Sequence, residues 1–145
     1  MQVADLTSKL SYAKRLQVGA VVVKGHKILA TGYNGMPAGW DNNCEYEDTG
    51  FSDAVFGEPQ TIISRGLKTK PEVLHAESNA ITKLATSTES SEGSTMFCTH
   101  APCIHCAKLI YQSGIKTLYY MNTYRDSAGL EFLEKSGVII VRHSV

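Results

Sequence analysis

Two short segments of this 145-residue chain carry residue types that bind transition metals. His75 and Glu77 stand two residues apart in the sequence HAE, and Cys103 and Cys106 stand three apart in PCIHC. At the start of a helix this cysteine spacing puts both sulfur atoms on one face, and the positive end of the helix favours their thiolate forms. Two thiolates and one imidazole are a good tetrahedral zinc set with a fourth position left for water. An open position indicates a catalytic zinc.

Glu77 supplies a carboxylate beside this metal set. Inside a helix, residues i and i+2 point about 200° apart, so His75 and Glu77 face one metal only if His75 stands at the helix entry. Zinc with two thiolates is formally neutral and acidifies water weakly, so a nearby base is needed to take the proton. The alternative is that Glu77 is merely a helix-start carboxylate favoured by the dipole.

Other uses of a CxxC motif explain the sequence less well. A four-cysteine zinc ribbon needs a second CxxC, and attachment of c-type haem needs a histidine where Ala107 stands. A thioredoxin-like dithiol is an alternative interpretation of the motif, but it does not explain the HAE segment. The other two cysteines, Cys44 and Cys98, are expected to be small buried hydrophobes.

The order of predicted elements indicates how these segments are positioned. Hydrophobic periodicity predicts helices over 2–15, 75–85, 103–113 and 127–136, and strands over 18–23, 27–34, 95–99, 115–121 and 138–142. Gly114 and Gly137 are expected to end the third and fourth helices. Residues 35–71 show no sustained period and are expected to form a long loop. We therefore predict an α/β fold, a three-layer α-β-α sandwich with a mixed five-stranded sheet, in a single domain of residues 1–145.

The amino-acid composition limits the classes of partner that the chain is expected to bind. Lysine plus arginine equals aspartate plus glutamate, 14 against 14, so there is no general attraction to a nucleic acid polymer or an anionic membrane. A small anionic ligand needs only a local basic pocket. No run approaches the ~20 apolar residues of a membrane span, and the start of the chain does not look like a signal peptide. We expect a cytoplasmic protein with reduced cysteines.

HxE followed by PCxxC is the signature of zinc nucleobase deaminases. More specifically, the chain resembles the deoxycytidylate (dCMP) deaminases of the cytidine/deoxycytidylate deaminase superfamily. The matching stretches are QVGAVVVKGHKILATGYNGMPAGWDNNC, HAESNAI and PCIHCAKLIYQSGIKTLYYMNTYRD. GYNG at 32–35 followed by Pro37, and NAI at 79–81, favour this branch over free-nucleoside or tRNA relatives.

The resemblance implies a cytidine-deaminase-like fold and hydrolysis of dCMP to dUMP and ammonia, which supplies dUMP for dTTP synthesis. It implies that Glu77 takes a proton from water, protonates N3 of cytosine and later protonates the departing amine. It implies one catalytic zinc, held by His75, Cys103 and Cys106. The implied substrate-binding residues are Asn34 at the sugar or phosphate, Tyr124 on the pyrimidine, Arg15 and Arg125 at the 5′-phosphate, and Ala76.

Several of these roles have ordinary structural alternatives. Asn34 with Gly35 could be turn chemistry, Tyr124 a common aromatic residue, and the two arginines solvated charges; Lys14 is a competing phosphate ligand. His100 is a candidate for lining the pocket, whereas His105 is expected to point away from the metal.

The resemblance also implies a homohexamer activated by dCTP and inhibited by dTTP, with Mg²⁺ accompanying a nucleoside triphosphate effector. Some relatives hold a second zinc, but Ala13 replaces the cysteine they use and residues 35–74 contain no histidine. We therefore expect one zinc per chain. A broader deaminase that also accepts dCTP, a tRNA adenosine deaminase and a non-catalytic zinc module are the alternatives.

Overall fold

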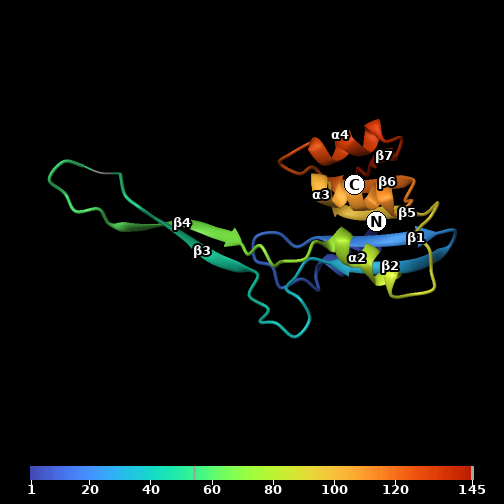
Figure 1. The fold of residues 1–145 in the computed structure, drawn as a ribbon, viewed down its shortest axis with the longest axis horizontal. Helices are drawn as coiled ribbons and strands as arrows, with labels where there is room; N and C mark the ends of the chain where they lie inside the picture. The colour runs from blue at the N-terminus through green and yellow to red at the C-terminus, as the bar shows by residue number, and fades with distance from the viewer. Residues whose placement is uncertain (54, 145) are drawn as a thin grey trace.

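The computed structural model describes residues 1–53 and 55–144 (Figure 1). The elements in chain order are α1 (Gln2–Ser8), β1 (Gly19–Lys24), β2 (Lys27–Tyr33), β3 (Glu45–Phe51), β4 (Ile62–Thr69), α2 (Ala76–Ala85), β5 (Thr95–His100), α3 (Ile104–Gln112), β6 (Thr117–Asn122), α4 (Ala128–Lys135) and β7 (Ile139–Arg142). Gly114 and Gly137 follow α3 and α4 with φ of 78° and 81°, as their predicted capping role requires. None of the described helices is both long and apolar enough to cross a membrane.

The main sheet has five strands in the order β2-β1-β5-β6-β7. β5, β6 and β7 are parallel, whereas β1 is antiparallel to both β2 and β5. The second antiparallel pair arises because α2 carries the chain from β2 across to β5, so that β5 runs in the direction of β2 and opposite to β1. The predicted mixed five-stranded sheet is confirmed.

Helices cover both faces of this sheet, as the three-layer prediction requires. Ala20 and Val22 of β1 point into the main core, where they pack with residues of α2, α3 and α4 such as Ala80, Ile110 and Leu133. Gly19 lies against the backbone of α1, and alternate residues of a strand face opposite sides of its sheet. Thus α2, α3 and α4 lie on one face and α1 on the other.

Two glycines allow the backbone to pack closely beside the predicted metal segments. A Cβ on Gly32 of β2 would collide with the carbonyl oxygen of Ala76 and the amide of Ala80 in α2. A Cβ on Gly129 of α4 would collide with the backbone at Pro102 and Cys103. These contacts seat the start of α2 on the sheet and the start of α4 against the PCIHC segment.

The predicted helix over 2–15 is wrong beyond Ser8, where α1 ends. The following segment is held to other parts of the chain by side chains. Ser11 Oγ donates to the carbonyl of Asn34 (2.7 Å), and the Gln17 side chain donates to the carbonyl of Ser11 (2.7 Å). With these side-chain bonds in place, the segment continues to β1 through turns and irregular backbone.

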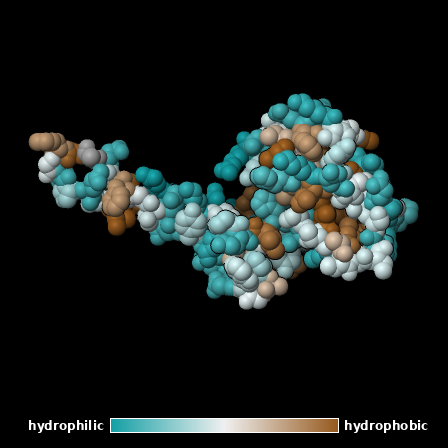
Figure 2. All heavy atoms as spheres, in the orientation of Figure 1, coloured by the Kyte–Doolittle hydropathy of each residue, from teal (hydrophilic) through white to brown (hydrophobic). Residues whose placement is uncertain are grey.

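The prediction of an irregular loop over 35–71 is wrong for residues 45–51 and 62–69, which form β3 and β4. β3 and β4 pair as an antiparallel hairpin, which we call the arm (residues 45–69), and the arm projects from the body of the molecule (Figure 1). Gly66, with φ of 97°, lies where the register shifts. Large apolar side chains remain exposed along the arm, and some show as brown patches in Figure 2: Tyr46, Phe51, Ile62, Ile63 and Leu67.

Candidate metal centre and active site

His75 stands directly before the first residue of α2. It is the N-cap of that helix and has extended backbone angles, φ −80° and ψ 152°. Its side chain therefore does not follow the helical rotation, and both His75 and Glu77 line the same cavity. The predicted position of His75 at the helix entry is confirmed.

Cys103 and Cys106 occupy the start of α3 in the same way. Cys103 is the N-cap, and Cys106 lies in the first turn. His75 Nδ1 lies 3.6 Å from Cys103 Sγ and 3.4 Å from Cys106 Sγ, and the three donor atoms are all within 4.8 Å of one another. Tetrahedral zinc with ordinary bond lengths would separate nitrogen from sulfur by about 3.6 Å. The donor set therefore fits zinc.

The electrostatic environment keeps a negative charge on the sulfur pair. A hydrogen bond from the Cys106 thiol lowers the pKa of Cys103 to about 3, and the same bond raises the pKa of Cys106. The hydrogen bond to Cys103 also raises the pKa of His75. Burial raises the pKa of the Glu77 carboxyl, whose residue is only 4 % exposed. A cation would bring both thiols to the thiolate form that metal binding requires.

A cavity of about 1030 Å³ opens beside these donors. It lies where β5 and β6 end, since the residues that follow both strands line it together with the start of α2. Ligands in α/β proteins commonly bind at this edge of a sheet. The predicted site residues among its lining are Arg15, Asn34, His75, Ala76, Glu77, Cys103, Tyr124 and Arg125. Residues far apart in the sequence thus converge on one cavity with a metal set at one end.

Residues 1–122 match the family described as the cytidine and deoxycytidylate deaminase zinc-binding region. The chain belongs to this family. It is 37 % identical over 150 residues to deoxycytidylate deaminase of Enterobacteria phage T4, an alignment that covers 86 % of this chain and 76 % of the relative. It is 40 % identical over 130 residues to the human deoxycytidylate deaminase, with 88 % and 65 % covered.

Solved structures agree with this membership. The dCMP deaminase of cyanophage S-TIM5 in complex with dCMP and dUMP superposes with a TM-score of 0.84 at 44 % identity, covering 98 % of this chain and 92 % of that one. A structure of tRNA:A34 deaminases matches at 17 % identity with a TM-score of 0.59, which shows a shared fold alone. This deaminase fold is thus the predicted cytidine-deaminase-like one.

Asn34, one of the predicted substrate contacts, already makes side-chain hydrogen bonds within the protein. Its Oδ1 accepts a hydrogen bond from the Val18 amide (2.8 Å), and its Nδ2 donates to the Leu16 carbonyl (2.8 Å). These bonds tie the end of β2 to the segment before β1. An amide group has two donor hydrogens and two acceptor lone pairs, so one of each is left for a ligand.

The predicted aromatic and arginine contacts lie in the segment between β6 and α4. The Arg125 guanidinium lies over the Tyr124 ring, 5.7 Å from its centroid. Tyr124 is half-buried and Arg125 is exposed at the cavity mouth. Lys14, the competing phosphate ligand, does not line this cavity.

Sequence reasoning missed one wall of the cavity. The base of the arm contributes Glu45, Tyr46, Lys68 and Thr69 to the lining, and Lys70 directly after it also contributes. No local pattern points to these residues, because it is the pairing of β3 with β4 that brings them together. His100, a candidate for lining the pocket, does line the cavity, and burial lowers the pKa of its imidazole. His105 is exposed on the lining and lies outside the metal donor set, as expected.

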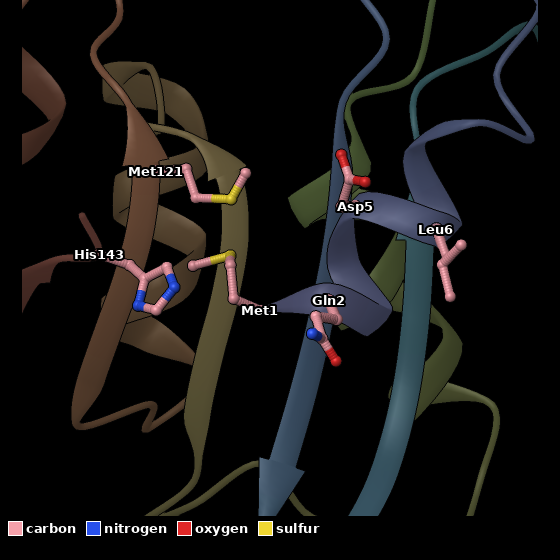
Figure 3. A pocket seen from close by; sticks show the side chains of 6 residues that line it. All are labelled: Met1, Gln2, Asp5, Leu6, Met121 and His143. Carbon is pink, nitrogen blue, oxygen red and sulfur yellow. The ribbon is translucent and has the colours of Figure 1, made fainter. Parts of the chain in front are cut away.

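A smaller pocket of about 460 Å³ lies beside α1. Figure 3 shows the side chains of Met1 and Met121 near each other, with His143 close by. This pocket shares no residue with the metal centre or the larger cavity. All four cysteines of the chain are free, and Cys44 and Cys98 are fully buried, which confirms their prediction as small hydrophobes.

Proposed function

We propose that this chain hydrolyses dCMP to dUMP and ammonia with one catalytic zinc. The observation that carries the proposal is the grouping of His75, Cys103 and buried Cys106 as metal donors, with His75, Cys103 and buried Glu77 lining one cavity. The relatives described above are deoxycytidylate deaminases, and a similar structure holds dCMP and dUMP.

In this mechanism the protein provides the metal ligands and a proton carrier. Zinc, when bound, would supply a Lewis acid that acidifies a water molecule at its open position. Glu77 takes a proton from that water and donates one to N3 of cytosine as the water oxygen attacks C4. Glu77 then takes the second proton from the oxygen now bonded to C4 and passes it to the amine as the bond from C4 to nitrogen breaks, which leaves the carbonyl of dUMP and ammonia. The carboxyl is suited to this exchange because it is buried and lines the same cavity as His75 and Cys103.

The other lining residues would orient the nucleotide. Tyr124 would pack on the pyrimidine face, and Asn34 would use its remaining donor and acceptor at the sugar or phosphate. Arg15 and Arg125 would bind the 5′-phosphate through paired N–H groups, the geometry for which arginine is suited. The backbone at fully buried Ala76, at the start of α2, would lie against the base.

We further propose that the chain assembles with copies of itself, as a hexamer in the family pattern, and that dCTP with Mg²⁺ and dTTP act as effectors. The exposed apolar residues of the arm support assembly, because an isolated two-stranded hairpin is marginally stable in water. Sedimentation equilibrium tests the assembly, and a monomer at micromolar concentration would contradict it. A cytoplasmic location is part of the proposal, consistent with four free cysteines.

Ammonia release tests the substrate directly. Zinc-loaded protein would be assayed with dCMP, dCTP, cytidine and cytosine at equal concentration. We expect the highest kcat/KM with dCMP. Comparable turnover of dCTP would identify the broader nucleotide deaminase, while highest activity on the free base would refute a nucleotide substrate altogether.

A further inference from the structure

We propose that Glu45 is a positioning residue that directs Arg15 toward the phosphate of the substrate, an inference that rests on the function proposed above. Glu45 is the first residue of β3, at the base of the arm. It is only 3 % exposed, and it lines the cavity with Arg15. A buried carboxylate at the edge of a nucleotide cavity requires an explanation, since its charge opposes that of a phosphate.

The contacts of Glu45 are with the segment that carries Arg15. Its Oε1 accepts hydrogen bonds from the backbone amides of Lys14 (2.9 Å) and Arg15 (3.1 Å). Thr69 stands opposite Glu45 in the register of β3 and β4, and its Oγ1 accepts a hydrogen bond from Arg15 Nη1 (3.0 Å). One pair of opposite residues in the arm therefore holds both the backbone and the guanidinium of Arg15.

Holding both ends matters because a free arginine side chain samples many rotamers. Each immobilised long side chain costs conformational entropy when a ligand binds. An arginine that the protein has already ordered would lose less entropy on meeting a phosphate. Glu45 and Thr69 thus act on phosphate affinity without touching the substrate themselves.

The second carboxylate oxygen of Glu45 argues against a purely structural role. Among the residues that the structure describes, buried Oε2 has no hydrogen-bond partner. An unpaired buried carboxylate oxygen destabilises a fold. Buried polar groups that destabilise the fold without a compensating contact are typical of functional sites. The charge serves the proposed role because a carboxylate accepts stronger hydrogen bonds from the Lys14 and Arg15 amides than a neutral acceptor would.

The test separates ligands with a phosphate from ligands without one. Dissociation constants of dUMP and deoxyuridine would be measured by calorimetry on the zinc-loaded protein, with kcat and KM for dCMP measured in parallel. The variants are Glu45→Gln, which keeps the size and removes the charge, and Thr69→Val, which removes only the guanidinium contact. Glu47→Gln is the matched control, because Glu47 is an exposed carboxylate two residues along the same strand.

We expect Glu45→Gln to weaken dUMP binding and raise KM for dCMP by about tenfold, since neutral hydrogen bonds are about half as strong as charge-assisted ones. Deoxyuridine affinity and kcat should stay within about twofold of wild type. Thr69→Val should cause a smaller shift in the same direction, and Glu47→Gln none. In the double variant with Arg15→Ala, the loss should not exceed that of Arg15→Ala alone.

Three results would overturn the proposal. Equal weakening of dUMP and deoxyuridine would show that Glu45 merely anchors the arm. Unchanged dUMP affinity, or effects of Glu45→Gln and Arg15→Ala that add, would show that it does not act through Arg15. Failure of the proposed function looks different: the wild type would release no ammonia from dCMP, while the calorimetric comparison could still be made.

Discussion

Glu77→Gln is the substitution that tests the chemistry most directly. Glutamine has the size of glutamate, so the side chain should remain in its buried place in the first turn of α2. The proposed metal donors are His75, Cys103 and Cys106, and none of them is altered. The variant therefore removes the ability to accept and donate a proton and leaves the metal set in place.

The expected loss follows from the burial of Glu77. With only 4 % of the residue exposed, solvent has little access to replace the missing carboxylate. A positioned acid–base group contributes roughly 10²- to 10⁴-fold to a rate. Because Glu77 would serve in both the attack of water and the departure of ammonia, we expect the upper part of this range. A loss of about 10⁴-fold in kcat corresponds to about 5 kcal/mol of transition-state stabilisation.

The assay is steady-state ammonia release from dCMP, with zinc content measured by mass spectrometry on the same samples. Glu72→Gln is the control, since Glu72 is exposed and precedes the same helix. We expect Glu77→Gln to retain one zinc per chain and a wild-type melting temperature. Activity above about a tenth of wild type would refute the proton-carrier role. Loss of zinc would mean that Glu77 supports the metal set instead.

Three further changes test the site and the packing beneath it. Cys106→Ser should abolish stoichiometric zinc binding and turnover, because it removes one of the three donors; wild type should hold one zinc per chain, and two would contradict the single-site prediction. Ile110→Ala empties a fully buried core position and should cost about 3 kcal/mol in urea unfolding, whereas exposed Lys108→Ala should be neutral. Gly32→Ala should lower both the melting temperature and kcat, since its Cβ would push the backbone of α2 at Ala76 away from the sheet. A stable, fully active Gly32→Ala variant would show that α2 tolerates this displacement.

The main sheet and the metal segments are the parts that the sequence predicts well. Strand and helix periodicities report which face of a local element is buried, and they placed the five central strands close to their observed bounds. Position 75 at the helix entry followed from the helical rotation between His75 and Glu77. The prediction for position 75 holds because it depends only on the geometry of one helical turn.

The first helix and the arm were mispredicted for a different reason. The apolar spacing that predicts a helix continues past Ser8, but residues 9–18 form turns and irregular backbone that side-chain bonds from Ser11 and Gln17 hold to other parts of the chain. The strands of the arm are exposed along nearly their whole length, so they lack the alternation of buried and exposed residues that marks a strand in sequence. Their pairing is visible only in three dimensions.

The sequence by itself determined the chemistry of the metal centre, because the donor types and their spacing at two helix starts leave few other uses. Tertiary structure alone decided what forms the rest of the cavity. Glu45 accepts a hydrogen bond from the Arg15 amide, 30 positions earlier in the sequence. The Asn34 side chain uses one donor and one acceptor to bind the segment before β1. Contacts over such separations depend on how whole elements pack, and no local pattern of residues encodes them.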